Sequence, residues 1–232
     1  MNHFSRKIAC KSASVVSKIL LGAVVMPAAF CLSSCSKAID YFDSVSELRS
    51  NILVAAQNNL SLCVFAVEKE TPYAADGIKR ETSPRTEIYL TAPTGADSYN
   101  VFFNFGGKEY GGDMSFDNVK LEYFYSCTLD VSAASEIGFT IEFDGSTVEM
   151  TAKSVRTEET LPPREILNKV RASESELFKS MTDKNGFAGE IYLRLIYEDA
   201  PYYYVGVIDR DGKINAFLTD CKDGKILAKR QM

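Results

Sequence analysis

Apolar and polar side chains alternate with a period of two along the middle of the chain, which is typical of strands with one buried face. Asp144-Gly145 separates the last two runs, and this pair is a strong hairpin signal because both central positions of such a turn favour a positive φ. We therefore expect five antiparallel strands in a β-sandwich or a curled sheet. Their apolar positions lie within Ile88–Ala92, Tyr99–Phe105, Val119–Leu129, Ile137–Phe143 and Val148–Ala152.

The segment before these strands predicts a helix and then a buried strand. Ser44-Val45-Ser46-Glu47 matches a capping box, and apolar residues follow at helical spacing as far as about Gln57. The run Leu60–Glu68 is apolar on both faces and rich in strand formers, so it predicts a strand covered on both sides. The polar stretch 69–85 contains Pro72, Gly77 and Pro84 and predicts a loop.

The last third of the chain predicts a helix that packs on a small antiparallel sheet. Residues 157–162 form a polar, proline-ended linker, and Pro163 is well placed at the first position of a helix. We expect this helix to end at Asn185-Gly186. Its apolar stripe consists of Ile166, Val170, Leu177 and Met181, and the strands that follow are Glu190–Tyr197, Tyr202–Asp209 and Ile214–Asp220, with a short return over residues 225–229.

Together these patterns predict an α+β fold. Residues 44–156 form a helix plus a β-rich region, and residues 163–232 form a helix on three or four antiparallel strands. Whether the two regions are one domain or two stays open.

The first 34 residues have the pattern of a secretory signal peptide. They contain four basic residues and no acidic residue, and the uncharged run Ile19–Leu32 is 14 residues long. A spanning helix needs roughly 20 apolar residues, and Pro27 weakens this run further. We therefore expect residues 1–34 to be removed after targeting.

This segment ends in Leu32-Ser33-Ser34-Cys35, which resembles the lipobox of bacterial lipoproteins. The resemblance implies that the Cys35 thiol receives a diacylglyceryl group, that a signal peptidase cuts before Cys35, and that the new amino group takes a fatty acid such as palmitate. Two or three acyl chains anchor a protein stably, whereas one chain binds only marginally. It also implies attachment to the cell membrane on the extracellular or periplasmic side, through a tether of residues 35–43. In the alternative, an ordinary secretory signal, Cys35 has no role.

Removal of residues 1–34 leaves 22 basic and 31 acidic residues, a net charge of −9. This balance argues against nucleic acid and anionic lipid headgroups as partners, since both need a concentrated basic face. The single histidine, His3, leaves with the signal. The remaining chain therefore has no means of running a Ser-His-Asp or Cys-His mechanism, or of building the usual zinc or non-haem iron site. We expect no metal and no cofactor.

Three cysteines remain beside Cys35, and their odd number permits at most one disulfide. We expect none. Cys63 and Cys127 fall at apolar positions of strands and are interpreted as small buried hydrophobic residues. Cys221 falls in a turn, where it can be exposed.

Two runs near the end of the chain, Tyr203–Val207 and Asp220–Leu227, flank an Asp211-Gly212-Lys213 turn. With the helix before them, they make the segment from about Pro163 to Arg230 resemble the small PepSY-type module of bacterial envelope proteins. The resemblance covers at most the last third of the chain. It implies binding, including modulation of an envelope peptidase, rather than catalysis.

Tyr202 and Tyr204 are the candidate binding residues. Alternation places them on the strand face opposite Tyr203, Val205 and Val207, which we expect to face the helix. The two tyrosines then form an aromatic platform for a peptide or a glycan.

Two classes of function remain. We expect a membrane-anchored, non-catalytic envelope protein that binds a peptide, a glycan or another envelope protein. The alternative is a histidine-free enzyme, such as a glycan hydrolase that uses two carboxylates. The adjacent pairs Glu158/Glu159 and Glu198/Asp199 lie in polar loops beside prolines, which is typical of solvated charge rather than of acid–base chemistry.

Overall fold

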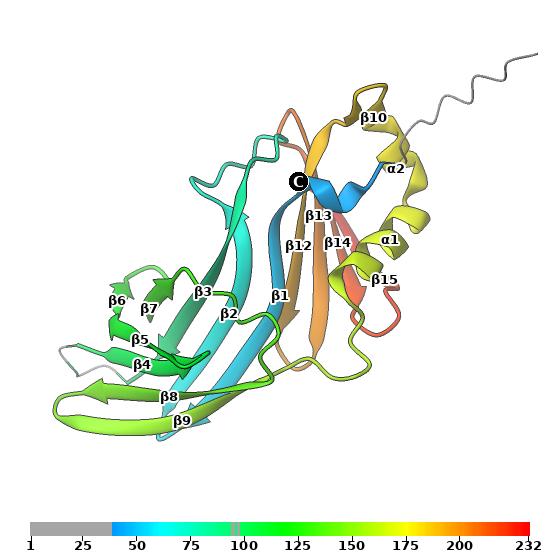
Figure 1. Cartoon of the computed structure of the whole chain (residues 1–232). Helices are drawn as coiled ribbons and strands as arrows, with labels where there is room; N and C mark the ends of the chain where they lie inside the picture. Colours follow the sequence, from blue (N-terminus) through cyan, green and yellow to red (C-terminus); the bar gives the residue numbers. More distant parts are fainter. Residues whose placement is uncertain (1–38, 94–95, 97) are drawn as a thin grey trace, which may run out of the picture. The chain divides into compact units, whose positions relative to one another are not determined.

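The computed structural model describes residues 39–93, 96 and 98–232, which belong to one compact unit. Strands make up 56% of the structure and helices 11%. Most of the strands join in one large, nearly closed sheet (Figure 1). The expected α+β fold is therefore wrong: the structure is mostly β.

Thirteen strands of the described residues form the main sheet. They are β1 (Val45–Gln57), β2 (Leu60–Glu70), β3 (Thr82–Thr91), β4 (Asn100–Phe105), β5 (Lys108–Asp113), β6 (Ser115–Asp117), β7 (Glu122–Cys127), β8 (Glu136–Phe143), β9 (Ser146–Ser154), β12 (Gly189–Tyr197), β13 (Pro201–Asp209), β14 (Ile214–Asp220) and β15 (Ile226–Gln231). A separate hairpin pairs β10 (Thr182–Asp183) with β11 (Gly186–Phe187). The helical segments are η1 (Tyr41–Ser44), α1 (Pro163–Ser173) and α2 (Ser175–Ser180).

Strand β1 lies at the centre of the sheet. One of its edges pairs with β2 in the antiparallel sense along almost its whole length. The first part of its other edge runs parallel to β12, and the end of that edge runs antiparallel to β9. From this junction the sheet continues through β12, β13, β14 and β15 in one direction and through β9, β8, β4 and β5 in another.

The first hydrophobic core lies where β1, β2, β3 and β7 meet β4, β5, β8 and β9. The Tyr125 hydroxyl on β7 donates to the carbonyl of Gly111 on β5 at 3.1 Å, so the two ends of this curved part come into contact. The Phe103 ring packs between Tyr110 and Phe139, at centroid distances of 5.5 and 5.0 Å. Further fully buried members of this core are Leu53, Val64, Ile88, Leu90, Val101 and Ile141.

The second core lies between the helices and strands β12 to β14. Ile166 and Val170 of α1 are fully buried there with Tyr203, Val205 and Val207 of β13, as the alternation predicts. Burial of each such aliphatic side chain contributes about 1.5–3 kcal/mol relative to leaving it exposed. This core fixes the two faces of β13 and therefore the direction in which Tyr202 and Tyr204 point.

The start of the described chain is held against the helices. The Tyr41 ring packs edge-on against Phe178 at 5.1 Å and against Phe187 at 5.3 Å. The Asp40 carboxylate caps η1 through the Phe42 amide and forms an ion pair with Arg164 at 2.5 Å. The hydrogen bond from Arg164 holds the pKa of Asp40 below its ordinary value.

The segment predicted as a helix over residues 44–57 is strand β1. Because β1 is central, adjacent residues are buried on opposite sides: Leu53 belongs to the first core and Ile52 to the second. Irregular register between Val45 and Glu47, and again between Arg49 and Asn51, breaks the two-residue alternation. The resulting spacing of apolar residues resembles that of a helix.

The strand predicted over 119–129 is shorter than expected. Strand β7 covers only Glu122–Cys127, while Val119 is 93% exposed and Leu121 has a φ of +58° in the turn before it. The predicted loop over 69–85 is also too long, because β2 extends to Glu70 and β3 begins at Thr82. The Asp144-Gly145 turn is confirmed, with φ values of +46° and +73°.

The predicted strands of the last third are confirmed, but the predicted helix is interrupted. It begins at Pro163 as expected, breaks at Glu174 and ends at Ser180. Asn185-Gly186 lies instead at the β10–β11 hairpin. Residues 157–162 connect β9 to α1, and the Leu161 amide donates to the carbonyl of Cys221 at 2.8 Å.

Candidate functional site

The two tyrosines singled out from the sequence lie on β13, on the face turned away from α1. Tyr203 is fully buried on the helix side, whereas Tyr202 and Tyr204 are half-buried on the other side. Tyr204 pairs in register with Arg194 of β12, and the Arg194 guanidinium lies 5.7 Å from the centre of the Tyr204 ring. Tyr204 is therefore one member of a larger cluster.

Arg194 is the centre of that cluster. Its guanidinium lies over the Tyr192 ring at 4.5 Å, forms an ion pair with the Glu47 carboxylate of β1, and approaches the Tyr73 hydroxyl at 3.4 Å. The Tyr73 ring packs on Tyr192 at 5.7 Å. Burial lowers the pKa of Arg194, but its hydrogen bond to Glu47 and the charge of Glu47 raise that pKa by more. The net shift is upward, so the Arg194 side chain stays cationic.

The cluster continues across the sheet through Arg49, the register partner of Arg194 on β1. The Arg49 guanidinium lies 3.9 Å from the centre of the Phe65 ring. Phe65 packs on Tyr89 at 5.3 Å, and Tyr89 packs on Phe124 at 5.0 Å. Each cation–π contact of this kind contributes about 0.5–1 kcal/mol at a partly exposed site.

We call this set the arginine–tyrosine strip. It crosses β13, β12, β1, β2, β3 and β7, and the loop 71–81 contributes one residue. Its members are Arg49, Phe65, Tyr73, Tyr89, Phe124, Tyr192, Arg194 and Tyr204.

Two polar atoms of the strip, Arg49 Nε and Arg194 Nε, are buried without a hydrogen-bond partner, and the Tyr192 hydroxyl interacts with that of Tyr73. Most buried polar atoms in folded proteins have a partner, so two unpaired ones in one cluster are unusual. Burial also raises the pKa values of Tyr89 and Tyr192, so both hydroxyls stay protonated; the Tyr89 hydroxyl donates to the Glu87 carboxylate at 3.2 Å. The strip thus offers donors together with ring faces.

A shallow cavity of about 340 Å³ lies at one end of the strip. Tyr89, Phe124 and Lys120 line it together with Phe116. The Lys120 ammonium lies 4.7 Å from the centre of the Tyr89 ring. A larger cavity, about 560 Å³, lies outside the strip beside Phe103 and the polar side chains of β4 and β8.

Two buried carboxylates lie beneath the loop 71–81, next to the strip. Glu190 accepts from the Gly77 amide at 3.4 Å, and Glu70 accepts from the Arg80 amide. Burial is the main reason why the pKa of Glu190 is raised, and the charges of Glu70 and Asp76 add to it. Both side chains are almost completely buried, so no substrate reaches them while the loop is in place.

The carboxylate pairs considered for acid–base chemistry are exposed. Glu158, Glu159, Glu198 and Asp199 all lie at the surface, and Glu159 forms an ion pair with Lys222 at 2.5 Å. That ion pair lowers the pKa of Glu159 through its hydrogen bond and charge, which is opposite to the shift that a general acid needs. These residues are solvated charges, as their loops indicate.

The remaining predicted sites divide into those within the described residues and one outside them. Cys35 lies outside the described residues. The thiols of Cys63, Cys127 and Cys221 are unpaired; Cys221 is buried rather than exposed, and the other two are only partly buried. Within residues 39–93, 96 and 98–232 no three His, Cys, Asp or Glu side chains are placed to hold a metal.

No helix in the described part of the chain is long and apolar enough to cross a membrane. Comparison with protein families, with curated proteins and with solved structures finds no match for this chain.

Sequence reasoning found Tyr204 but missed Arg194, Arg49 and Tyr73. One signal was available: Arg194 and Glu190 are charged residues inside an otherwise apolar strand, Glu190–Tyr197. A charge in a buried strand is costly unless it is paired, so each such residue implies a partner on a neighbouring strand. That partner, Glu47, was hidden because its segment was interpreted as a helix.

Proposed function

We propose that this chain is a bacterial envelope lipoprotein, anchored to the membrane through Cys35, and that its folded part is a non-catalytic binding module. The lipobox-like Leu32–Cys35 and the preceding charge and apolar pattern support the anchor. Absence of histidine from the chain after residue 34, and the exposed positions of the loop carboxylate pairs, support binding rather than catalysis.

The arginine–tyrosine strip is the proposed binding surface. One observation carries this assignment: the partly exposed rings of Tyr73, Tyr89 and Tyr204 occur together with the half-buried guanidinium groups of Arg49 and Arg194 in one cluster. A ligand with hydroxyl groups bonds to the exposed parts of these side chains and stacks on the rings. The strand backbones beneath are already paired in the sheet, so recognition depends on side chains.

A neutral glycan is the ligand class that fits this surface best. A sugar ring presents an apolar face that stacks on Tyr73 or Tyr204 and hydroxyls that bond to a guanidinium or a carboxylate. Two of the four cations beside the rings are paired, Arg194 with Glu47 and Lys69 with Glu87 at 2.5 Å, while Arg49 and Lys120 lie over ring faces. These pairs reduce the positive charge of the surface, so recognition depends mainly on ring stacking and hydroxyl groups.

Modulation of an envelope peptidase is the second candidate function. It is supported by the helix-then-strands order of residues 163–231, which agrees with the likeness to PepSY-type modules. Tyr204 and Arg194 belong to this region, so a bound peptide also contacts the strip. Competition between short peptides and soluble glycan fragments for the same surface distinguishes the two ligand classes.

Binding is tested with soluble oligosaccharides from bacterial cell-wall glycan and with isolated wall fragments. We expect Tyr73→Ser and Arg194→Gln to weaken binding strongly. Tyr197→Ser is the matched control, because Tyr197 is 42% exposed and Tyr73 is 43% exposed, but Tyr197 lies outside the strip. Equal binding by Tyr73→Ser and Tyr197→Ser contradicts the assignment of the strip.

The anchor is tested separately with Cys35→Ala in cells that receive a fatty-acid probe. We expect the variant to lose the label and to accumulate as an unprocessed or released form. A variant that still labels and still partitions with membranes contradicts the lipoprotein proposal.

A further inference from the structure

One end of the described unit is built from four segments that are distant in sequence: η1, the loop 71–81, the β10–β11 hairpin and the turn 210–213. We call it the η1 end. Tyr41 of η1 packs on Phe187 of the hairpin, and Gly189, just after the hairpin, pairs in register with Asp209. Gly77 lies so close to Asp209 that a Cβ at residue 77 would be 2.4 Å from the Asp209 carbonyl oxygen.

The length of chain before this end is short. Ile39, the first residue of the described unit, follows the proposed lipid anchor Cys35 by only four positions. Four extended residues span at most about 14 Å. The headgroup layer on each side of a bilayer is about 5–7 Å thick, so little of this length remains once the tether has left the lipid.

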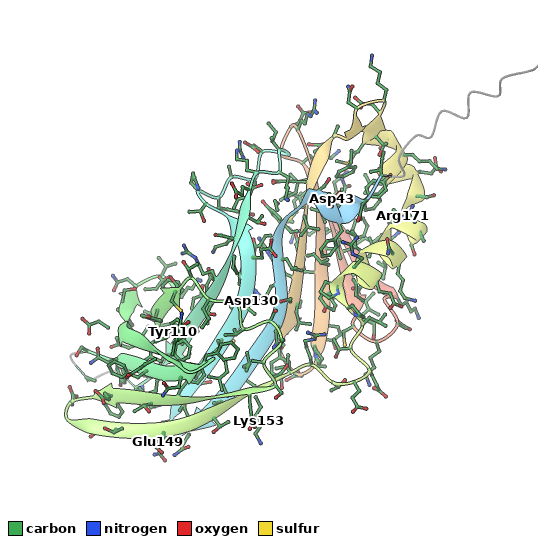
Figure 2. The ribbon with its side chains drawn as sticks, viewed as in Figure 1. Asp43, Tyr110, Asp130, Glu149, Lys153 and Arg171 are labelled. Carbon is green, nitrogen blue, oxygen red and sulfur yellow. The ribbon has the colours of Figure 1, made fainter. Side chains whose placement is uncertain are left out.

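The η1 segment has no freedom to swing away from the unit. Asp40 pairs with Arg164 of α1, the Arg164 guanidinium also lies 4.3 Å from the centre of the Phe42 ring, and Tyr41 is packed between Phe178 and Phe187. The position of the tether therefore sets the orientation of the whole unit. In Figure 2, Asp43 and Arg171 mark this end, while Tyr110 and Glu149 lie at the other.

The surface of the η1 end suits a neutral lipid interface. Its exposed apolar side chains include Ile39, Tyr73 and Ile78, of which Ile78 is 53% exposed. Charges of both signs lie around them, for example Arg80 paired with Asp76 at 2.5 Å. We propose that the η1 end lies on the surface of the bilayer that holds the anchor, with Ile39 and Ile78 in the headgroup layer. This inference rests on the lipid anchor proposed above.

A second exposed apolar group competes for this role. Val119 and Leu121 lie in the turn before β7, and the pairing of Leu90 with Tyr123 places that turn at the opposite end of β3 from the loop 71–81. Strand β3 has ten residues, so the two groups are about 30 Å apart. A tether at the η1 end brings Ile78 to the bilayer and leaves Val119 in water.

Tryptophan fluorescence tests this orientation, because the chain contains no tryptophan. Ile78→Trp and Val119→Trp are matched variants at exposed apolar positions on opposite ends of β3. A chain that begins at Cys35 is ligated through its amino-terminal cysteine to a diacyl lipid thioester. It is then inserted into phosphatidylcholine vesicles that contain a lipid with a shallow spin-label quencher, and circular dichroism verifies the fold of both variants.

We expect several-fold stronger quenching in Ile78→Trp than in Val119→Trp. Equal quenching, or stronger quenching in Val119→Trp, overturns the proposed orientation. Because the lipid is attached chemically, this result does not depend on whether cells acylate Cys35. Fatty-acid labelling of Cys35→Ala tests that question, so failure of the anchor and failure of the orientation are distinguished.

Discussion

The Arg194 guanidinium on β12 donates to the Glu47 carboxylate on β1 across 147 positions of sequence. The two side chains are 28% and 10% exposed and lie on the parallel pair of strands that connects the helix-covered part of the sheet to β1. Arg194 also stacks on Tyr192, so one guanidinium takes part both in holding two strands together and in shaping the strip.

We expect Arg194→Met to destabilise the protein, because it leaves the Glu47 carboxylate unpaired. Breaking a buried ion pair costs about 3–5 kcal/mol, and partial exposure here reduces the expected loss to about 1–3 kcal/mol. Urea unfolding measures it. The double variant Glu47→Gln with Arg194→Met should lose less than the sum of the two single variants, and strict additivity would show that the pair contributes nothing.

The exposed pair Asp40–Arg164 provides a matched control for that measurement. Both of its side chains face water, so Arg164→Met should cost clearly less stability than Arg194→Met.

Substitutions on the two faces of β13 should differ sharply. Val205→Asp places an unpaired charge in the second core, where Val205 is completely buried, and should unfold this region at a cost of several kcal/mol. Tyr204→Ser should lower the melting temperature only modestly, since Tyr204 is half-buried in the strip. Thermal melts compare the two. If Tyr204→Ser unfolds the protein as severely as Val205→Asp, the strip is itself part of the hydrophobic interior and not a binding surface.

The raised pKa of Glu190 makes a defined contribution to the pH dependence of stability. Burial and the charges of Glu70 and Asp76 raise it above the ordinary 4.5, against the opposing hydrogen bonds from Ser46 and Gly77. Below pH 4.5 this carboxyl is protonated in both states and costs nothing. As pH rises above 4.5, the unfolded chain releases the proton first, so this group lowers the stability of the folded state.

Glu190→Gln removes that cost and keeps an oxygen to accept from Gly77. We therefore expect the variant to gain more stability relative to the original chain at pH 8 than at pH 5, measured by urea unfolding. Glu149→Gln, at an exposed position on β9, is the control and should show no such difference. A gain that is the same at both pH values would mean that Glu190 does not titrate in this range.

The three thiols should react slowly in the folded protein. Burial raises the pKa of Cys63 from 9.0 to about 11, which lowers its thiolate fraction at pH 8 about 100-fold. Burial also raises the pKa of Cys221. We expect slow alkylation by iodoacetamide at pH 8 and rapid labelling of all three thiols in denaturant. A native monomer that lacks two hydrogens by mass would instead contain a disulfide.

The sequence pattern predicts strands well where one face of the sheet is buried and the other faces water. Ile137, Phe139 and Ile141 alternate with exposed or half-buried residues, and β8 lies where the pattern places it. The pattern fails at β1 because that strand has a hydrophobic core on each of its two faces. Ile52 and Leu53 are then both buried, and no period of two survives.

The candidate site could be predicted only in part for a related reason. Tyr204 was found because its strand alternates regularly. Arg49 and Tyr73 come from an irregular strand and a loop, and they reach the strip only through pairing with residues that lie far along the chain. Register across a parallel pair is a tertiary property that no local pattern encodes.

The parallel pairing of β1 with β12 also has a consequence for how the chain reaches its folded state. Synthesis delivers β1 and β2 early, and they can form a hairpin at once, but the first part of the other edge of β1 has no partner until β12, in the last third of the chain, emerges. An unpaired strand edge is a template for pairing with another chain. Nascent and prematurely terminated chains are thus the aggregation-prone forms of this protein, whereas in the full chain β12 covers the exposed edge of β1.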